Sequence, residues 1–362
     1  MNEVKERVRA LQSSMSTEGL GAYYVVSPFN LRYISGFTGT SGIALITNNG
    51  AYFITDFRYK EQAESQCDGF KIILAGGSAG TGSPQKVVQD ILTEENISRV
   101  GYEEEHITVA DFDDLESIIT ADLIPASGLI EILRETKEPE EIEKIKVACQ
   151  IADLAFHHIL EFIKPGVTEI EIANELDFFM RSKGASGVSF DTIVASGVRS
   201  AMPHGVASNK KVANGELITL DYGCYYEGYA SDITRTIALG DVDRKLEEIY
   251  QIVLDANERV TTALKADMTG KEADAIARDL IKERGYGSQF GHSLGHSIGL
   301  DIHEIPNLSM HSSHILRPGN VVTNEPGIYL EGLGGVRIED DLLITEKGNE
   351  LLTHSPRELI HL

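Results

Sequence analysis

The first third of the chain alternates between helix-like and strand-like patterns of hydrophobic residues. Residues 4–18 carry apolar side chains at helical spacing, and residues 21–27 form a short apolar run typical of a strand. Two more apolar runs, 43–47 and 51–55, flank Asn48-Asn49-Gly50, which favours a tight hairpin turn. These patterns predict an α/β unit with mixed strand order.

Glycine and proline mark further boundaries in this unit. We expect residues 30–42 to form a glycine-rich loop. Ser83-Pro84 is expected to open a helix, because proline is favoured at the first helical position. Residues 99–102 are typical of another strand.

A chain of 362 residues is too long for one ordinary domain. The highly charged stretch 130–146 is interpreted as a linker that passes into a long helix near Pro139. We therefore predict a first domain at residues 1–128, a linker at 129–140 and a second domain at 141–362.

The second domain contains an internal repeat. The pattern of residues 164–184 recurs at 265–285, at an offset of 101. Thr168 and Thr269 each stand three residues before a glutamate, which is the capping-box spacing of a helix start. Each segment then ends at a glycine, as helices commonly do. Each half is predicted to contain two helices followed by a hairpin.

The repeat continues into two strands that deliver carboxylates. Residues 215–223 match residues 319–327 at an offset of 104, so that Asp221 corresponds to Glu325. A second acid follows each of them, Asp232 in the first half and Glu339 in the second, at an offset of 107. Small loop insertions explain this drift. Two such halves would pair about a pseudo-twofold axis and bring four carboxylates together.

The spacing of these acids along the chain indicates whether their side chains face the same side of each hairpin. Asp221 and Asp232 are 11 residues apart, and paired residues of a hairpin closed by a two-residue loop are an odd number apart. Both can therefore face one side of adjacent strands, about 5 Å apart. Glu325 and Glu339 are 14 apart, so they need an odd loop or a bulge. Carboxylates this close repel one another unless a cation lies between them.

Three histidines lie among glycines between the two strands: His292, His296 and His303. Their spacing leaves open which one joins the carboxylates. One imidazole with four carboxylates suits manganese, cobalt, iron or zinc. Two such ions lower the pKa of a shared water and stabilise an oxyanion, and amide hydrolysis needs both actions.

Composition narrows the possible partners and the compartment. The formal net charge of -24 argues against nucleic acid and against an anionic membrane surface. No apolar run approaches the roughly 18 residues of a membrane span, and the N-terminus lacks an apolar signal core. The three cysteines show neither zinc spacing nor a disulfide framework. We expect a cytoplasmic protein.

The set Asp221, Asp232, His296, Glu325 and Glu339, with His204 in Met-Pro-His-Gly, resembles the dinuclear pita-bread metallopeptidases. That family includes prolidase, aminopeptidase P and methionine aminopeptidase. Leu-Arg-Tyr-Ile-Ser-Gly-Phe-Thr-Gly and Phe-Ile-Thr-Asp-Phe-Arg-Tyr are similar to its creatinase-type N-terminal domain. The resemblance covers nearly the whole chain. It implies an α+β protein, with a duplicated pita-bread domain after a smaller α/β domain.

The resemblance also implies roles. Asp221 would bind one ion, and Asp232 and Glu339 would bridge both ions. His296 and Glu325 would be the remaining ligands of the other ion, and Glu325 would also be the catalytic base. His204 and His303 would hydrogen-bond the substrate or the intermediate, His292 would shape a proline pocket and Arg337 would orient carboxylates. One departure is Ser297, where the family often has glycine.

The activity implied is metal-dependent hydrolysis of the bond preceding proline in dipeptides or short peptides, with manganese as the favoured metal and a homodimer as the expected assembly. Within the class, aminopeptidase P activity on longer peptides is the alternative. A metal-free peptide-binding module on this fold is the alternative from another class, and a metal-independent hydrolase of creatine-like substrates is a third. Loss of metal ligands would mark the last two, and all five positions are filled here.

Overall fold

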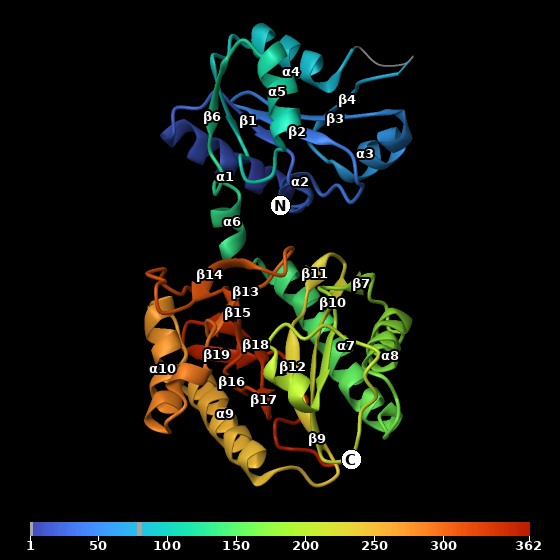
Figure 1. Ribbon diagram of the computed structural model, residues 1–362. Helices are drawn as coiled ribbons and strands as arrows, with labels where there is room; N and C mark the ends of the chain where they lie inside the picture. The colour runs from blue at the N-terminus through green and yellow to red at the C-terminus, as the bar shows by residue number, and fades with distance from the viewer. Residues whose placement is uncertain (1–2, 78–81) are drawn as a thin grey trace. The chain divides into compact units, whose positions relative to one another are not determined.

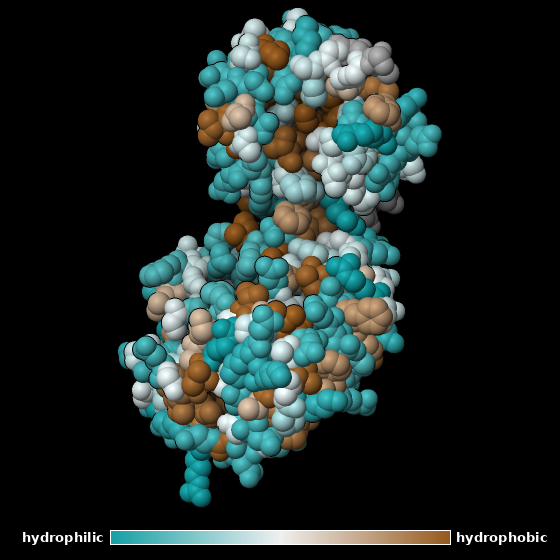
Figure 2. All heavy atoms as spheres, turned by 45° about the vertical axis from the view of Figure 1, so that its right-hand side comes forward, coloured by the Kyte–Doolittle hydropathy of each residue, from teal (hydrophilic) through white to brown (hydrophobic). Residues whose placement is uncertain are grey.

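The computed structural model describes residues 3–77 and 82–362. The chain divides into two compact units, Met1–Arg134 and Glu135–Leu362 (Figure 1). The division falls within the segment interpreted as a linker, part of which forms helix α6 (Glu131–Glu135). No helix within the described ranges is long and apolar enough to cross a membrane. On the face shown in Figure 2, hydrophilic side chains are interspersed with scattered hydrophobic ones.

The N-terminal unit is built on a mixed six-stranded sheet in the order β4-β3-β2-β1-β5-β6. The antiparallel pairs are β1 with β2 and β2 with β3, and the other neighbours run parallel. This confirms the predicted mixed order. The strands are β1 (Ala22–Val25), β2 (Ile43–Thr47), β3 (Ala51–Thr55), β4 (Lys71–Leu74), β5 (Arg99–Tyr102) and β6 (Asp122–Pro125).

Helices flank this sheet, and the helix predicted at Ser83-Pro84 is confirmed, with Ser83 as its N-cap. The glycine-rich loop predicted at residues 30–42 is wrong in its first part. Ser27 caps a helix that begins with Pro28, and Gly36 ends that helix in the left-handed conformation. A proline start and a glycine stop therefore define a helix where only the glycines were weighed. The helices are α1 (Glu3–Thr17), α2 (Pro28–Ser35), α3 (Lys60–Gln66), α4 (Pro84–Glu94) and α5 (Val109–Ile118).

The first half of the C-terminal unit contains two helices and an antiparallel sheet. Strand β9 is the centre of the three-stranded sheet β12-β9-β8, and a shorter sheet β11-β10-β7 continues the same hairpin toward its turn. The elements are α7 (Pro139–Phe162), α8 (Glu169–Ser182), β7 (Gly187–Val188), β8 (Ile193–Ser196), β9 (Glu216–Tyr222), β10 (Cys224–Tyr226), β11 (Tyr229–Ala230) and β12 (Ile233–Leu239).

The second half repeats this arrangement. Its five-stranded sheet has the order β14-β13-β15-β18-β19, and β16 pairs with β17 beyond it. The elements are α9 (Arg244–Ala263), α10 (Gly270–Glu283), β13 (Gly295–Ser297), β14 (Glu304–Leu308), β15 (Val321–Asn324), β16 (Gly327–Leu330), β17 (Gly334–Arg337), β18 (Asp340–Thr345) and β19 (Gly348–Leu351).

The duplication predicted from the sequence is visible in matched details of the two halves. Thr168 caps α8 and Thr269 caps α10, each in a complete capping box. The halves meet along β12, where the amide of Glu339 donates to the carbonyl of Thr234 at 3.0 Å. Figure 1 shows the helix pairs α7/α8 and α9/α10 on the two sides of the strands. Residues from both halves can therefore reach one site between them.

Candidate metal centre

Four carboxylates lie at strand ends of the two hairpins. Asp221 lies in β9 and Asp232 immediately precedes β12, while Glu325 immediately follows β15 and Glu339 precedes β18. Asp221, Asp232 and Glu339 are buried, and Glu325 is partly buried. The corresponding positions of the two halves thus bring their acids to the junction of the halves.

The first hairpin turns at Glu227-Gly228, because Tyr226 pairs with Tyr229 across a two-residue loop. In this register Asp221 lies opposite Thr234, two positions beyond Asp232. Side chains alternate along a strand, so the two carboxylates share a face as predicted. They are diagonal neighbours, however, and not a directly opposed pair.

The second hairpin confirms the odd loop that the even spacing required. Leu330 pairs with Gly334 across three residues, and Gly327 pairs with Arg337. Strands β15 and β18 carry the same register beyond this point, with Asn324 opposite Asp340. Glu325 and Glu339 therefore face each other between the two ladders.

Among the three candidate histidines, His296 reaches the carboxylates. Its Nε2 lies 3.6 Å from Asp232 Oδ2 and 3.5 Å from Glu325 Oε1. Its Nδ1 contacts the carbonyl of Ser297 at 3.1 Å, which turns Nε2 toward the acids. One ligand atom each from Asp232, His296 and Glu339 lie within 4.8 Å of one another.

Arg337 supports the carboxylates from one side. Its guanidinium donates to Asp221 Oδ2, to the hydroxyl of Tyr329 at 2.6 Å and to the hydroxyl of Thr234 at 3.1 Å. Thr234 in turn donates to Glu339 Oε2 at 2.6 Å. Arg337 therefore fixes two of the acids, one directly and one through a hydroxyl.

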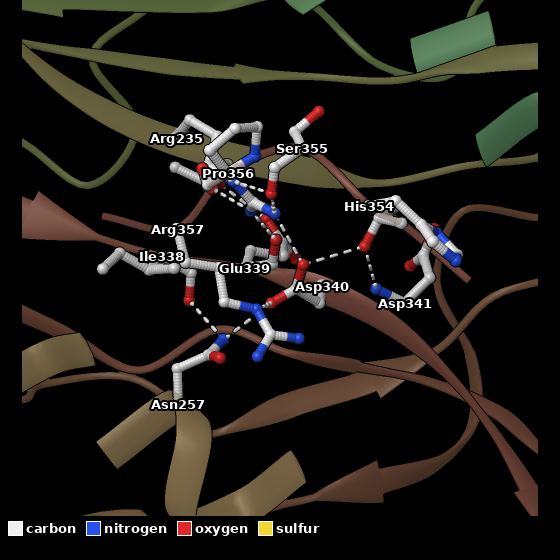
Figure 3. A network of polar contacts seen from close by, with 12 residues as sticks. Arg235, Asn257, Ile338, Glu339, Asp340, Asp341, His354, Ser355, Pro356 and Arg357 are labelled. Carbon is white, nitrogen blue, oxygen red and sulfur yellow. Dashed lines mark hydrogen bonds and ion pairs between the residues drawn. The ribbon is translucent and has the colours of Figure 1, made fainter. Parts of the chain in front are cut away.

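A second arginine holds the chain behind Glu339 (Figure 3). Arg235 is 1% exposed and donates to the carbonyls of Glu339 and Ser355 and to Asp340 Oδ1. Arg357 pairs with the other oxygen of Asp340 at 2.8 Å. Burial alone would raise the pKa of Asp340, but these two guanidiniums hold it below its ordinary value. The backbone that carries Glu339 is thus anchored on its far side.

The electrostatics of the acids call for a cation. Burial, followed by repulsion from Glu339 and Asp221, raises the pKa of Asp232 well above its ordinary value. Burial also raises the pKa values of Glu325 and Glu339. Asp232 Oδ1 is buried without a hydrogen-bond partner. A divalent ion would satisfy that oxygen and offset the repulsion, so these residues fit a metal site.

The imidazoles of His296 and His292 are uncharged at neutral pH because their pKa values are lowered. Burial lowers the pKa of His296 to about 4, and His303, whose ring centroid lies 4.5 Å away, adds to this shift. Burial and Arg337 lower the pKa of His292 to about 4. A neutral imidazole is the form that ligates a metal.

All the side chains predicted from the sequence line one cavity of about 440 Å³. This volume lies within the range of ~300–1,000 Å³ that is typical of small-molecule sites. Apolar Phe190, Ile193, Val206 and Ile302 form much of the remaining wall. The predicted residues are His204, Asp221, Asp232, His292, His296, His303, Glu325, Arg337 and Glu339.

Several supporting residues were not found by sequence reasoning. Tyr329 joins Arg337 to His292, whose Nε2 is 2.9 Å from the tyrosine hydroxyl. Asp341 accepts the backbone amide of Asp232 at 2.9 Å. The position of Thr234 opposite Asp221 could have been derived from the hairpin register, whereas Tyr329 gave no signal in the sequence.

Comparison with known proteins decides the family. The Creatinase/Prolidase N-terminal domain matches residues 7–136, and Metallopeptidase family M24 matches residues 143–346. The chain belongs to metallopeptidase family M24. This M24 chain is therefore a peptidase, and its family is one that uses divalent metal ions.

Relatives and solved structures resemble this M24 peptidase over nearly its full length. It is 40% identical to the Xaa-Pro dipeptidase of Pyrococcus furiosus, over 99% of the chain and 100% of that protein. The structure of an Xaa-Pro dipeptidase from Bacillus anthracis matches with a TM-score of 0.97 and 50% identity, covering 99% and 100% of the two chains. An X-Pro aminopeptidase from Thermotoga maritima matches with a TM-score of 0.89 and 41% identity, covering 97% and 100%. Prolidase-like peptidases are thus its structural relatives.

Proposed function

We propose that this M24 peptidase hydrolyses the peptide bond preceding proline in Xaa-Pro dipeptides. One observation carries the proposal: five potential ligands from two half-domains converge on one cavity, where Asp232 Oδ1 has no partner. The relatives named Xaa-Pro dipeptidase support the substrate class. The proposed ligands are Asp221, Asp232, His296, Glu325 and Glu339, with manganese as the favoured metal.

Two bound divalent ions would supply Lewis-acid activation of the substrate carbonyl and a nucleophile at neutral pH. The chain's own residues would do the rest. Thr323 holds Glu325 by donating to its Oε1 at 3.2 Å, which leaves Oε2 to receive a proton in the reaction. Arg337 keeps Asp221 in place, and the imidazoles of His204 and His303 face the same cavity, where they would hydrogen-bond the substrate.

The walls of the cavity suit a proline ring. A prolyl amide has no N–H to offer, so recognition depends on shape and apolar contact more than on a backbone donor. Phe190, Ile193, Val206 and Ile302 supply that contact. His292 adds an aromatic ring to this wall, and the ring of Tyr329 packs behind it at a tilt of 55°, with the two ring centroids 5.5 Å apart.

The length of peptide that the site accepts depends on which residues bind the C-terminal carboxylate of the substrate. Among the described residues that line the cavity, Arg337 is the sole arginine or lysine, and it is paired with Asp221. His204 and His292 are therefore our candidates for binding the carboxylate of a dipeptide. Both also line a neighbouring hollow of about 620 Å³. This room beyond the two histidines is the observation that favours aminopeptidase activity on longer peptides as the second candidate.

Hydrolysis of three peptides by the manganese-loaded enzyme tests the proposal. We expect Ala-Pro to be cleaved with a higher kcat/KM than Ala-Pro-Ala, and Ala-Ala to be a poor substrate. Preference for Ala-Pro-Ala would assign aminopeptidase specificity instead. Preference for Ala-Ala would overturn the assignment to proline peptides.

A further inference from the structure

Lys137 is a buried cation whose role no sequence motif indicated. It lies between α6 and α7, and its side chain is 1% exposed. Its Nζ lies 3.0 Å from Glu304 Oε2, 3.1 Å from the hydroxyl of Ser297 and 3.4 Å from the carbonyl of Glu135. A buried ammonium with three oxygen partners is fully engaged, because it has three protons to donate.

The two side chains that Lys137 contacts form a cross-strand pair. Ser297 in β13 lies directly opposite Glu304 in β14. The backbone of Lys137 is held as well, since its amide donates to the carbonyl of Gly319 at 2.9 Å. Lys137 therefore links two neighbouring strands to the segment that leads into β15.

Two histidines of the proposed site stand next to these contact residues in the chain. His296 immediately precedes Ser297, and His303 immediately precedes Glu304. Both histidines line the catalytic cavity, whereas Ser297 and Glu304 do not. Because Ser297 and Glu304 lie outside the cavity lining, Lys137 contacts this segment on the side away from the cavity.

A short path of contacts joins Lys137 to the acids. The ammonium contacts the Ser297 hydroxyl, the Ser297 carbonyl contacts His296 Nδ1 at 3.1 Å, and His296 Nε2 faces Asp232 and Glu325. Ser297 also donates to the carbonyl of Val321 at 2.7 Å, which fixes its hydroxyl from a third strand. Ser297, which stands where the family often has glycine, is thus one of the residues through which Lys137 contacts His296.

We propose that Lys137 is a positioning residue for His296 and His303, acting through Ser297 and Glu304. This inference rests on the proposed metal-dependent function. Partners behind a metal-binding histidine set the direction of the ring, and their loss typically weakens metal binding or activity by about 10- to 100-fold. Lys137 would do this from the segment between α6 and α7, without touching the substrate.

The test must separate positioning from stability. Removing Lys137 alone would take away the ammonium that contacts the buried carboxylate of Glu304, and loss of one partner of a buried ion pair is strongly destabilising. The double variant Lys137→Met with Glu304→Gln removes both charges and keeps similar side-chain volumes. Ser297→Ala is the second variant, because it breaks the path and leaves the ion pair intact.

A matched control exists in the first half. Lys210 Nζ contacts Glu216 at 2.7 Å, the Ser196 hydroxyl at 2.8 Å and a backbone carbonyl at 3.4 Å, which repeats the partners of Lys137. Lys210→Met with Glu216→Gln removes a cluster with the same kinds of partner, which is less buried and contacts no proposed ligand. It reports what the loss of such a pair does to the fold alone.

Cobalt(II) titrated into the metal-free full-length variants, followed by visible absorption and calorimetry, gives the decisive readout. We expect about tenfold or greater loss of cobalt affinity in the Lys137/Glu304 double variant and a smaller loss in Ser297→Ala, with the control unchanged. With Ala-Pro as substrate and cobalt at saturation, kcat should fall while KM changes little.

Wild-type cobalt affinity in a folded double variant would overturn the role of Lys137. If that variant does not fold, unchanged affinity in Ser297→Ala overturns it. An equal loss in the Lys210/Glu216 control would show a purely structural effect and also overturn it. Failure of the wild-type enzyme to cleave Ala-Pro would instead remove the proposed substrate, and the cobalt titration would still decide the role of Lys137.

Discussion

Gly223 lies behind the first pair of carboxylates, where the backbone leaves no room for a side chain. A Cβ at this position would meet the carbonyl oxygen of Ser231 at 1.9 Å and the hydroxyl of Ser189 at 2.4 Å. Gly223→Ala must therefore displace Ser231 and with it the neighbouring Asp232. We expect a loss of about 3 kcal/mol or more in unfolding free energy, measured by urea denaturation.

Gly50 provides the comparison, because a Cβ there would meet its nearest atom at 3.5 Å, an ordinary contact. Gly50→Ala should change stability by no more than about 0.5 kcal/mol. Equal stabilities of the two variants would show that the hairpin adjusts more easily than its geometry indicates.

Glu325 tests the proposed base. Glu325→Gln keeps the size of the side chain and the hydrogen bond from Thr323, but an amide cannot take up a proton in the reaction. We expect kcat on Ala-Pro to fall by about 100-fold or more, as removal of a general base typically does. Steady-state kinetics at saturating manganese measures this, and an unchanged kcat would remove the assignment.

At the residue scale, the sequence predicted the acids and histidines but not their supports. The acids could be found because duplication placed Asp221 and Glu325 at matching positions. Arg235 and Tyr329 act through contacts made by residues distant in sequence, such as the carbonyl of Ser355, 120 positions away from Arg235. A local sequence pattern does not indicate contacts between residues so far apart in the chain.

The helix caps of the two halves are equivalent at the scale of the element. In each capping box, the threonine hydroxyl accepts the amide three residues on, and the glutamate accepts the threonine amide at 2.7 Å. Thr269→Ala should lower the unfolding free energy by about 1 kcal/mol in urea denaturation at pH 7. Thr262→Ala, at an exposed threonine inside α9, is the control and should cost nothing.

The same cap should depend on pH. Hydrogen bonds from the backbone and side chain of Thr269 lower the pKa of Glu272 from its ordinary value of 4.5. A lowered carboxyl pKa in the folded state adds stability above pH 4.5, and that stability is lost as pH falls through the folded value. The difference between the wild type and Glu272→Gln should therefore shrink on acidification, and a constant difference would contradict this reasoning.

Elements were predictable where a local signal and the tertiary structure agree. Strands β2 and β3 have the predicted bounds because an Asn-Gly turn and two apolar runs favour the same hairpin. Helix α2 was missed because the glycines that follow it, from Gly36 on, were weighed and its Ser-Pro start was not. The face shared by Asp221 and Asp232 followed from parity, but their diagonal offset depends on where the chain turns.

At the scale of the molecule, metal ions should govern stability. Buried acids that repel one another destabilise the folded chain without a cation, and an ion that binds only the folded state stabilises it by mass action. Chelation should therefore abolish hydrolysis and lower Tm, and added manganese should restore hydrolysis to a plateau while Tm keeps rising with the logarithm of its concentration. Differential scanning fluorimetry over a manganese series measures this. Full activity after exhaustive chelation would contradict the metal-dependent mechanism.

The division of the proposed ligands between the halves has a consequence for how the enzyme could be taken apart. Asp221 and Asp232 belong to one half, and the other three ligands belong to the second. A cut at exposed Asp241 would separate them into two pieces, neither able to assemble the centre by itself. Recovery of hydrolysis on mixing would then show that the two pieces had associated, with the metal ions bound by ligands from both.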